Sequence, residues 1–196
     1  KVIVVEAGRR WKSEDFPKTN WRVWKSMWMP SLFCRGIMRL TLLSDVLALS
    51  GAGVGGGSLV YGNTLLVPPD PFFNDQSWAG MKDWKSALMP FYDTAQRMLG
   101  VNKSPRLFRG DESLRRIAKE MGREETFHIA DVGIFFGEEG VEVEDPYFDG
   151  KGPRRSGCTF CGGCMIGCRH NAKNTLDKNY LYLAEQGGAQ VVPDRK

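Results

Sequence analysis

The chain has 196 residues, of which 42% are hydrophobic, so it is long enough for one full core or two small ones and too apolar to be disordered. Its 27 basic and 23 acidic side chains are interleaved to a net charge of +4, which argues against the basic stripe of a nucleic-acid-binding protein. The longest uncharged stretch, residues 46–69, carries six glycines and two prolines, which a membrane-spanning helix would not tolerate.

The first eight residues predict a buried strand that ends in an acid and a glycine, Glu6 and Gly8. In dinucleotide-binding folds an acid at such a strand end binds the adenosine ribose, about 20 residues after a glycine-rich first turn. An ordinary exposed glutamate is the alternative. Because the strand begins at once and no Met precedes it, we expect a fragment whose first strand and helix lie upstream. No leader fixes the compartment, although a cytoplasmic or membrane-peripheral location is favoured.

Three tryptophans, Trp21, Trp24 and Trp28, recur at helical spacing and predict one apolar face of a short helix. Packing in the core or under a lid is the expected role, with an aromatic wall facing a substrate as the alternative.

A short strand from Val46 is then expected to lead into a glycine-rich turn and a short helix. Gly51, Gly53 and Gly56 match the spacing GxGxxG, but Pro68 and Pro69 leave no room for the long helix of a nucleotide fingerprint. Such a turn still allows a diphosphate or a flat ring to approach the main chain, partly because helix N-termini attract anions. A purely structural glycine hinge is the alternative.

The middle third is expected to be an insertion without a catalytic cluster. We predict helices over residues 81–99, kinked or split by Pro90, and 111–121, then a strand-like run over 126–136 and a charged connection over 137–156. His128, in the strand-like run, is expected in the core.

Four of the five cysteines, Cys158, Cys161, Cys164 and Cys168, follow the spacing CxxCxxCxxxC with which bacterial ferredoxins bind iron-sulfur clusters. A cluster with three or four thiolate ligands is therefore a candidate. Zinc is less suitable, because only two residues separate the pair Cys158 and Cys161 from the pair Cys164 and Cys168. Disulfides would close very short loops, and reduced structural thiols remain an alternative.

The last segment predicts an amphipathic helix over residues 175–185, stopped by two glycines, and a strand from Gln190.

Three blocks carry a family resemblance: VIVVEAG at the start, GAGVGGGSLVYGNTLLVPPD in the middle, and the cysteine run followed by AKNTLDKNYL near the end. Together they resemble the glucose-methanol-choline oxidoreductases, most closely their cholesterol oxidase-like branch. The resemblance covers essentially the whole chain.

The resemblance implies an α/β fold, namely part of a Rossmann-like FAD-binding domain with an inserted, largely helical cap on the substrate side. Residues 1–70 would form the partial FAD-binding core, 71–157 the inserted cap, and 158–196 the cysteine loop with the helix and strand that return to the core. It further implies that FAD is bound by a set of residues in the first two blocks: Glu6, Gly8, Gly55, Gly56, Gly57, Ser58, Gly62, Asn63 and Thr64.

Two features of the family do not match this chain. Many relatives have Asn where this chain has Tyr61, which leaves open which side chain touches the flavin. The family's catalytic histidine lies near the C-terminus of the full-length enzyme, and neither His128 nor His170 matches it, so no catalytic residue is assigned.

The predicted function is oxidation of the CH-OH group of an alcohol by hydride transfer to FAD, with a sterol or another bulky apolar alcohol as the small-molecule substrate. One alternative is a sugar or long-chain alcohol dehydrogenase whose iron-sulfur relay serves a redox partner. Another is a ferredoxin-like electron-transfer module, and a non-enzymatic flavin-fold scaffold is a third. The flavoenzyme predicts residues 2–6 and 190–192 in one sheet, whereas the ferredoxin-like module predicts a separate domain around the cysteines.

Overall fold

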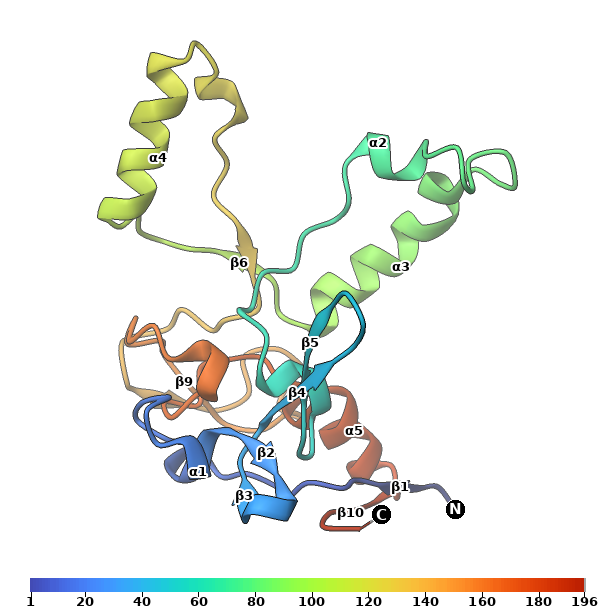
Figure 1. Ribbon diagram of the computed structural model, residues 1–196, viewed down its shortest axis with the longest axis vertical. Coiled ribbons are helices and arrows are strands. Elements are labelled where there is room, and N and C mark those ends of the chain that lie inside the picture. The colour runs from blue at the N-terminus through green and yellow to red at the C-terminus, as the bar shows by residue number, and fades with distance from the viewer. Residues whose placement is uncertain (196) are drawn as a thin grey trace.

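The computed structural model describes residues 1–195 (Figure 1). The helices are α1 (Val23–Ser26), α2 (Asp70–Phe73), α3 (Trp84–Met98), α4 (Arg109–Glu120) and α5 (Tyr180–Gln186). The strands are β1 (Ile3–Val5), β2 (Trp28–Met29), β3 (Cys34–Arg35), β4 (Met38–Leu42), β5 (Leu47–Gly51), β6 (Asn102–Lys103), β7 (Asp131–Val132), β8 (Glu142–Val143), β9 (Arg155–Ser156) and β10 (Gln190–Val192). This mixture of helices and strands confirms the predicted α/β class.

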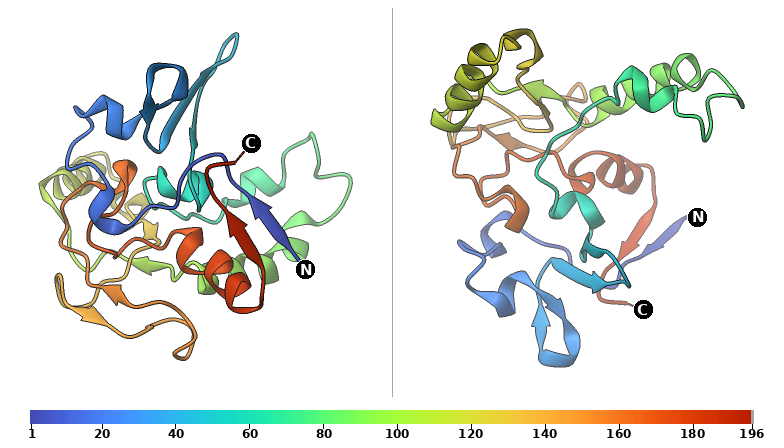
Figure 2. Two further views of the ribbon diagram at one scale, coloured as in Figure 1. Left: turned by 90° about the horizontal axis from the view of Figure 1, so that it is seen from below. Right: turned by 45° about the horizontal axis from the view of Figure 1, so that its top comes forward.

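The two ends of the chain form one parallel strand pair. In β1 and β10, Ile3 pairs with Gln190 and Val5 with Val192. The strands lie side by side in both views of Figure 2, with α5 just before β10 in the chain. A parallel pair needs a long crossover connection, which residues 6–189 supply here. The pairing predicted for the flavoenzyme is confirmed, and the separate ferredoxin-like domain is wrong.

The glycine-rich turn follows a hairpin. β4 and β5 pair antiparallel, from Met38 opposite Gly51 to Leu42 opposite Leu47. After β5 the chain passes through the turn into a single 3-10 turn over Gly56–Leu59. The predicted order of strand, turn and short helix is confirmed. The helix is a 3-10 turn and not an α-helix, because its first residues are glycines, which lose much backbone entropy on folding.

Two arms project from the rest of the molecule (Figure 1), one built from α2 and α3 and the other from α4. Asp83 starts α3 by accepting the N–H of Ser86 at 3.0 Å, and the helix runs through Pro90 unbroken. The predicted split at Pro90 is therefore wrong, whereas the two predicted helices are confirmed.

Three other expectations fail wholly or in part. The tryptophan helix is only the single turn α1, since Met27 turns extended and Trp28 enters β2, which leaves Trp21 85% and Trp24 62% exposed. The strand-like run contains only β7, and its His128 is exposed. The last helix is divided at Asn179 into a 3-10 turn, Leu176–Lys178, and α5.

A small apolar core lies beneath the glycine turn. Trp11 and Phe16 stack with ring centroids 5.2 Å apart, and Ile37, Leu59 and Val60 complete the cluster. The residues directly after the glycines are therefore buried, which fixes the turn from below. Within residues 1–195, no helix is both long enough and apolar enough to cross a membrane.

Candidate cofactor site and cysteine loop

Glu6 connects the end of β1 to the glycine turn. Its Oε1 accepts the N–H of Gly8 at 2.7 Å and the N–H of Gly53 at 3.0 Å. Hydrogen bonds from backbone N–H groups to a carboxylate are among the stronger ones in proteins. The acid that the sequence singled out therefore holds the strand end and the turn together.

The glycine turn has one packed side and one open side. Gly53 and Gly55 have φ angles of 136° and 114°, which side chains rarely adopt, and a Cβ on Gly51 would lie 2.0 Å from the carbonyl oxygen of Gly56. A Cβ on Gly56 or Gly57 would meet nothing within 4 Å. The bare main chain of these two glycines consequently faces open space.

Glu6 and the open glycines share a cavity of about 460 Å³. Val4 and Val191 of the parallel strands and Leu181 of α5 form its apolar walls. A carboxylate near one side, bare glycine main chain and an apolar wall are the surroundings that an extended dinucleotide requires. The residues present therefore fit FAD.

Ser58 stabilises the turn itself. Its hydroxyl donates to the carbonyl oxygen of Gly55 at 2.6 Å and accepts the N–H of Leu176 at 2.9 Å. The hydroxyl thus joins the turn to the segment before α5, and both of these hydrogen bonds are made within the protein.

The run Gly62, Asn63 and Thr64 alternates between open and buried positions. Gly62 and Thr64 are exposed, whereas Asn63, with φ of 67°, is 1% exposed. The Asn63 side chain lies beside the thiol of Cys164, and its Oδ1 is buried without a hydrogen-bond partner. Of the three residues, Gly62 and Thr64 keep an open side, and Asn63 contacts the cysteine loop.

Tyr61 also points into the protein. Its hydroxyl donates to the carbonyl oxygen of Asn174 at 3.0 Å, and burial raises its pKa to about 12. The residue that replaces the family's Asn is therefore a neutral internal hydrogen-bond donor.

No sequence pattern pointed to Lys173, which is 1% exposed. Its Nζ donates to the carbonyl oxygens of Leu59, Tyr61 and Cys164 at 3.0, 2.9 and 2.9 Å. Burial lowers its pKa to about 8. The Lys173 ammonium group therefore links Leu59 and Tyr61, which follow the glycine turn, to Cys164 of the cysteine loop by hydrogen bonds.

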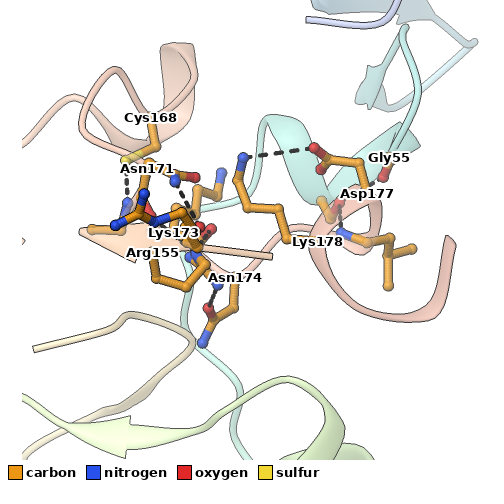
Figure 3. Close-up of polar contacts among 12 residues, drawn as sticks. Gly55, Arg155, Cys168, Asn171, Lys173, Asn174, Asp177 and Lys178 are labelled. Atoms are coloured by element: carbon orange, nitrogen blue, oxygen red, sulfur yellow. Dashed lines mark hydrogen bonds and ion pairs between the residues drawn. The ribbon is translucent and has the colours of Figure 1, made fainter. Parts of the chain in front are cut away.

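Arg155 is a second buried cation that the sequence did not reveal. Its guanidinium donates to the carbonyl oxygens of Asn171 and Lys173 and to Oδ1 of Asn174 (Figure 3). Burial lowers its pKa, and it forms no ion pair with any residue in the range 1–195. The sequence signal is limited to the AKNT run, residues 172–175, in which Lys173 and Asn174 supply two of the acceptors of Arg155.

The four loop cysteines line one mostly apolar cavity of about 220 Å³, together with Phe108, Phe136, Phe160 and Lys173. All four are free thiols, and burial raises the pKa of Cys158 and Cys164. Over residues 1–195, no group of three or more His, Cys, Asp or Glu side chains is placed to hold a metal ion. The described arrangement therefore does not support the predicted iron-sulfur cluster.

Comparison with known proteins gives a consistent result. No family model matches the chain. A cholesterol oxidase of Mycobacterium tuberculosis is 54% identical over 98% of this chain, and one of Acinetobacter baumannii is 46% identical over all of it. These matches support the resemblance to the glucose-methanol-choline oxidoreductases and to their cholesterol oxidase-like branch. It spans about a third of the length of these relatives, 34% and 36%.

The similarity to cholesterol oxidases implies a flavin cofactor. A more distant relative, a long-chain-alcohol oxidase of Arabidopsis thaliana, is 24% identical over 98% of the chain and is covered over 22% of its own length. These relatives are named as oxidases of alcohols. The segment that matches them contains the Glu6 strand, the glycine turn and the cysteine loop.

Proposed function

We propose that the protein to which this sequence belongs is an FAD-dependent oxidoreductase that oxidises the CH-OH group of an alcohol. The supporting observation is the cavity that Glu6 shares with Gly55, Gly56 and Gly57, where a carboxylate and bare main chain meet. In this proposal, residues 1–70 and 158–196 belong to a Rossmann-like FAD-binding domain, and residues 71–157 are an inserted cap on the substrate side.

The residues of this chain bind and orient the cofactor. Oε2 of Glu6 has no hydrogen bond within residues 1–195, and it is free to accept from a ribose hydroxyl, while Gly8 fixes the other oxygen. Gly55, Gly56 and Gly57 let the diphosphate approach the backbone, and Ser58 keeps the turn in shape. Gly62, Asn63 and Thr64 continue along the flavin ring. When bound, FAD supplies the hydride acceptor.

We further propose a sterol or another bulky apolar alcohol as substrate. The names of the two bacterial relatives support a sterol, and that of the plant relative supports a long-chain alcohol. Both are apolar alcohols, so the shared chemistry is a hydroxyl on a large hydrocarbon. A sugar is the contrasting candidate.

The experiment uses the complete protein that contains this sequence, purified with its bound flavin. Under anaerobic conditions we expect cholesterol, or else a long-chain alcohol, to bleach the flavin absorbance and yield the ketone or aldehyde. Bleaching by glucose with no response to either apolar alcohol would contradict the substrate class. Protein that contains no FAD and does not take it up would contradict the function itself.

A narrower proposal concerns Cys158, Cys161, Cys164 and Cys168 as ligands of an iron-sulfur cluster that passes electrons to a redox partner. Its basis is the ferredoxin-like spacing of the sequence. The four thiols line one cavity, and although no three of them are placed around a single ion within residues 1–195, a cluster of several irons holds its thiolates farther apart than a single ion does. The measurement is iron and acid-labile sulfide per flavin after anaerobic purification. Values near zero with full alcohol oxidation would remove this proposal.

A further inference from the structure

Lys173 is a buried cation with no carboxylate in ion-pair contact among residues 1–195, although the charge of Asp177 acts on it from farther away. Its three hydrogen-bond acceptors are all backbone carbonyl oxygens, and it forms no ion pair with any residue in the described range 1–195. Buried charges are normally paired, because removing a charge from water costs several kcal/mol. An unpaired ammonium at this place therefore calls for a reason besides packing.

The ammonium sets the orientation of one peptide plane in the run that follows the glycine turn. Nζ of Lys173 holds the carbonyl oxygen of Tyr61 on the inner side at 2.9 Å. The peptide bonds within residues 1–195 are all trans, and in a planar trans peptide the C=O and the next N–H point in opposite directions. The N–H of Gly62 must therefore point away from Lys173, outward from the protein.

The outward side of Gly62 is open. A Cβ on this residue would meet nothing within 4 Å, and its N–H donates to no group among residues 1–195. The neighbouring backbone does not share this freedom, since the carbonyl oxygen of Asn63 accepts the N–H of Gly133 at 2.9 Å. Gly62 thus presents a free donor to open space, and in the proposed FAD site this residue begins the run beside the flavin ring.

We propose that Lys173 is a positioning residue for the flavin: it turns the Gly62 N–H toward the ring and places an unneutralised positive charge behind that donor. The inference rests on the proposed FAD site. Positive charge and a hydrogen-bond donor both stabilise the negative charge that a flavin gains on reduction. Lys173 should therefore raise both the affinity for FAD and the reduction potential of the bound flavin.

Two substitutions separate the roles of the hydrogen bonds and the charge in the complete flavin-containing protein. Lys173→Gln removes the charge but keeps an N–H group able to reach a carbonyl oxygen, whereas Lys173→Met removes both. For Lys173→Met we expect the Kd for FAD to rise roughly tenfold or more. Both variants should have a more negative flavin potential than the parent.

Arg155→Lys is the matched control. Arg155 is also buried and also donates to carbonyl oxygens, but none of its acceptors lies in the run from Leu59 to Thr64. This variant keeps the positive charge while it loses hydrogen bonds, so it should be less stable with an unchanged flavin potential. It reports what a purely structural defect does.

An unchanged flavin reduction potential in flavin-loaded Lys173→Gln overturns the inference. Should Lys173→Met fail to fold, the potential of Lys173→Gln alone is the test. If the same variant instead slows the alkylation of Cys164 with the potential unchanged, the charge serves the thiols and the inference is equally wrong. A parent protein without flavin overturns the proposed function as well, so the two failures are distinguishable.

Discussion

Glu6 at the end of β1 accepts a hydrogen bond from the N–H of Gly53, which lies 47 residues later in the chain. The contact joins the strand that pairs with β10 to the turn that opens onto the 460 Å³ cavity. A substitution at Glu6 or Gly53 is therefore expected to disturb both the strand pair and the candidate cofactor site.

Replacing Glu6 with Ala should destabilise the fold. The substitution leaves the N–H groups of Gly8 and Gly53 without an acceptor, and both glycines are buried. We expect the free energy of unfolding to fall by about 1–3 kcal/mol in urea titrations. Glu6→Gln keeps an acceptor oxygen and should lose less, and the exposed Glu14→Ala is the control. Equal losses for Ala and Gln would contradict the role of the two hydrogen bonds.

Two glycines in the same turn should respond differently to a methyl group. A Cβ at Gly51 would lie 2.0 Å from a backbone oxygen, so Gly51→Ala should cost roughly 2 kcal/mol or more in unfolding free energy. The methyl group of Gly57→Ala would have no atom within 4 Å, so this substitution should change the free energy of unfolding by no more than about 0.5 kcal/mol. Because that methyl group enters the open side, we expect Gly57→Ala to weaken FAD binding, measured by flavin fluorescence. Unaltered FAD affinity would place the cofactor elsewhere.

The loop thiols should alkylate in a fixed order. Burial raises the pKa of Cys158 and Cys164, so at a given pH less of each is thiolate than in an ordinary cysteine, and their reaction sets in only at higher pH. Cys161 is exposed and should react first with iodoacetamide at pH 8. Fragmentation mass spectrometry gives the order.

Cys34, outside the cavity, is an internal reference for that experiment. Modification of Cys164 as fast as Cys161 would contradict the burial argument. Protection of all four loop thiols that ends on iron chelation would instead indicate a bound cluster.

Of two adjacent arginines, the one without an ion pair in the described part of the chain, Arg155, should contribute more to stability than Arg154, which forms two. Arg154 is exposed and pairs with Glu142 and Glu144 at 3.0 and 3.3 Å, whereas Arg155 is buried and forms no ion pair among residues 1–195. Exposed pairs contribute about 0–1 kcal/mol, so Arg154→Met should change little.

Arg155→Met removes three hydrogen bonds of a buried cation, although the carbonyl oxygens of Asn171 and Lys173 each keep a backbone N–H donor. We expect it to lower the unfolding free energy by about 3 kcal/mol or more. Similar losses for both substitutions in urea titrations would show that the buried hydrogen bonds contribute no more than the surface pairs.

The elements that the sequence predicted correctly are those determined by residues close together in the chain. The helices α3 and α4 follow from apolar spacing with a cap such as Asp83, and β1 from a run of β-branched residues. The tryptophan helix failed because its period describes which side chains share a face, while the chain after Ser26 leaves the helix to pair Trp28 with Arg35.

The sequence alone determined the family resemblance, the strand that ends in Glu6, the glycine turn and the grouping of four cysteines, because each is a local pattern of residue types and spacing. Only the tertiary structure decided that Glu6 holds Gly53, that Tyr61 and Asn63 turn inward, and that Lys173 and Arg155 are buried cations. A lysine or arginine in the sequence is exposed by default, and its burial depends on carbonyl oxygens contributed by distant segments, such as Leu59 and Cys164 for Lys173.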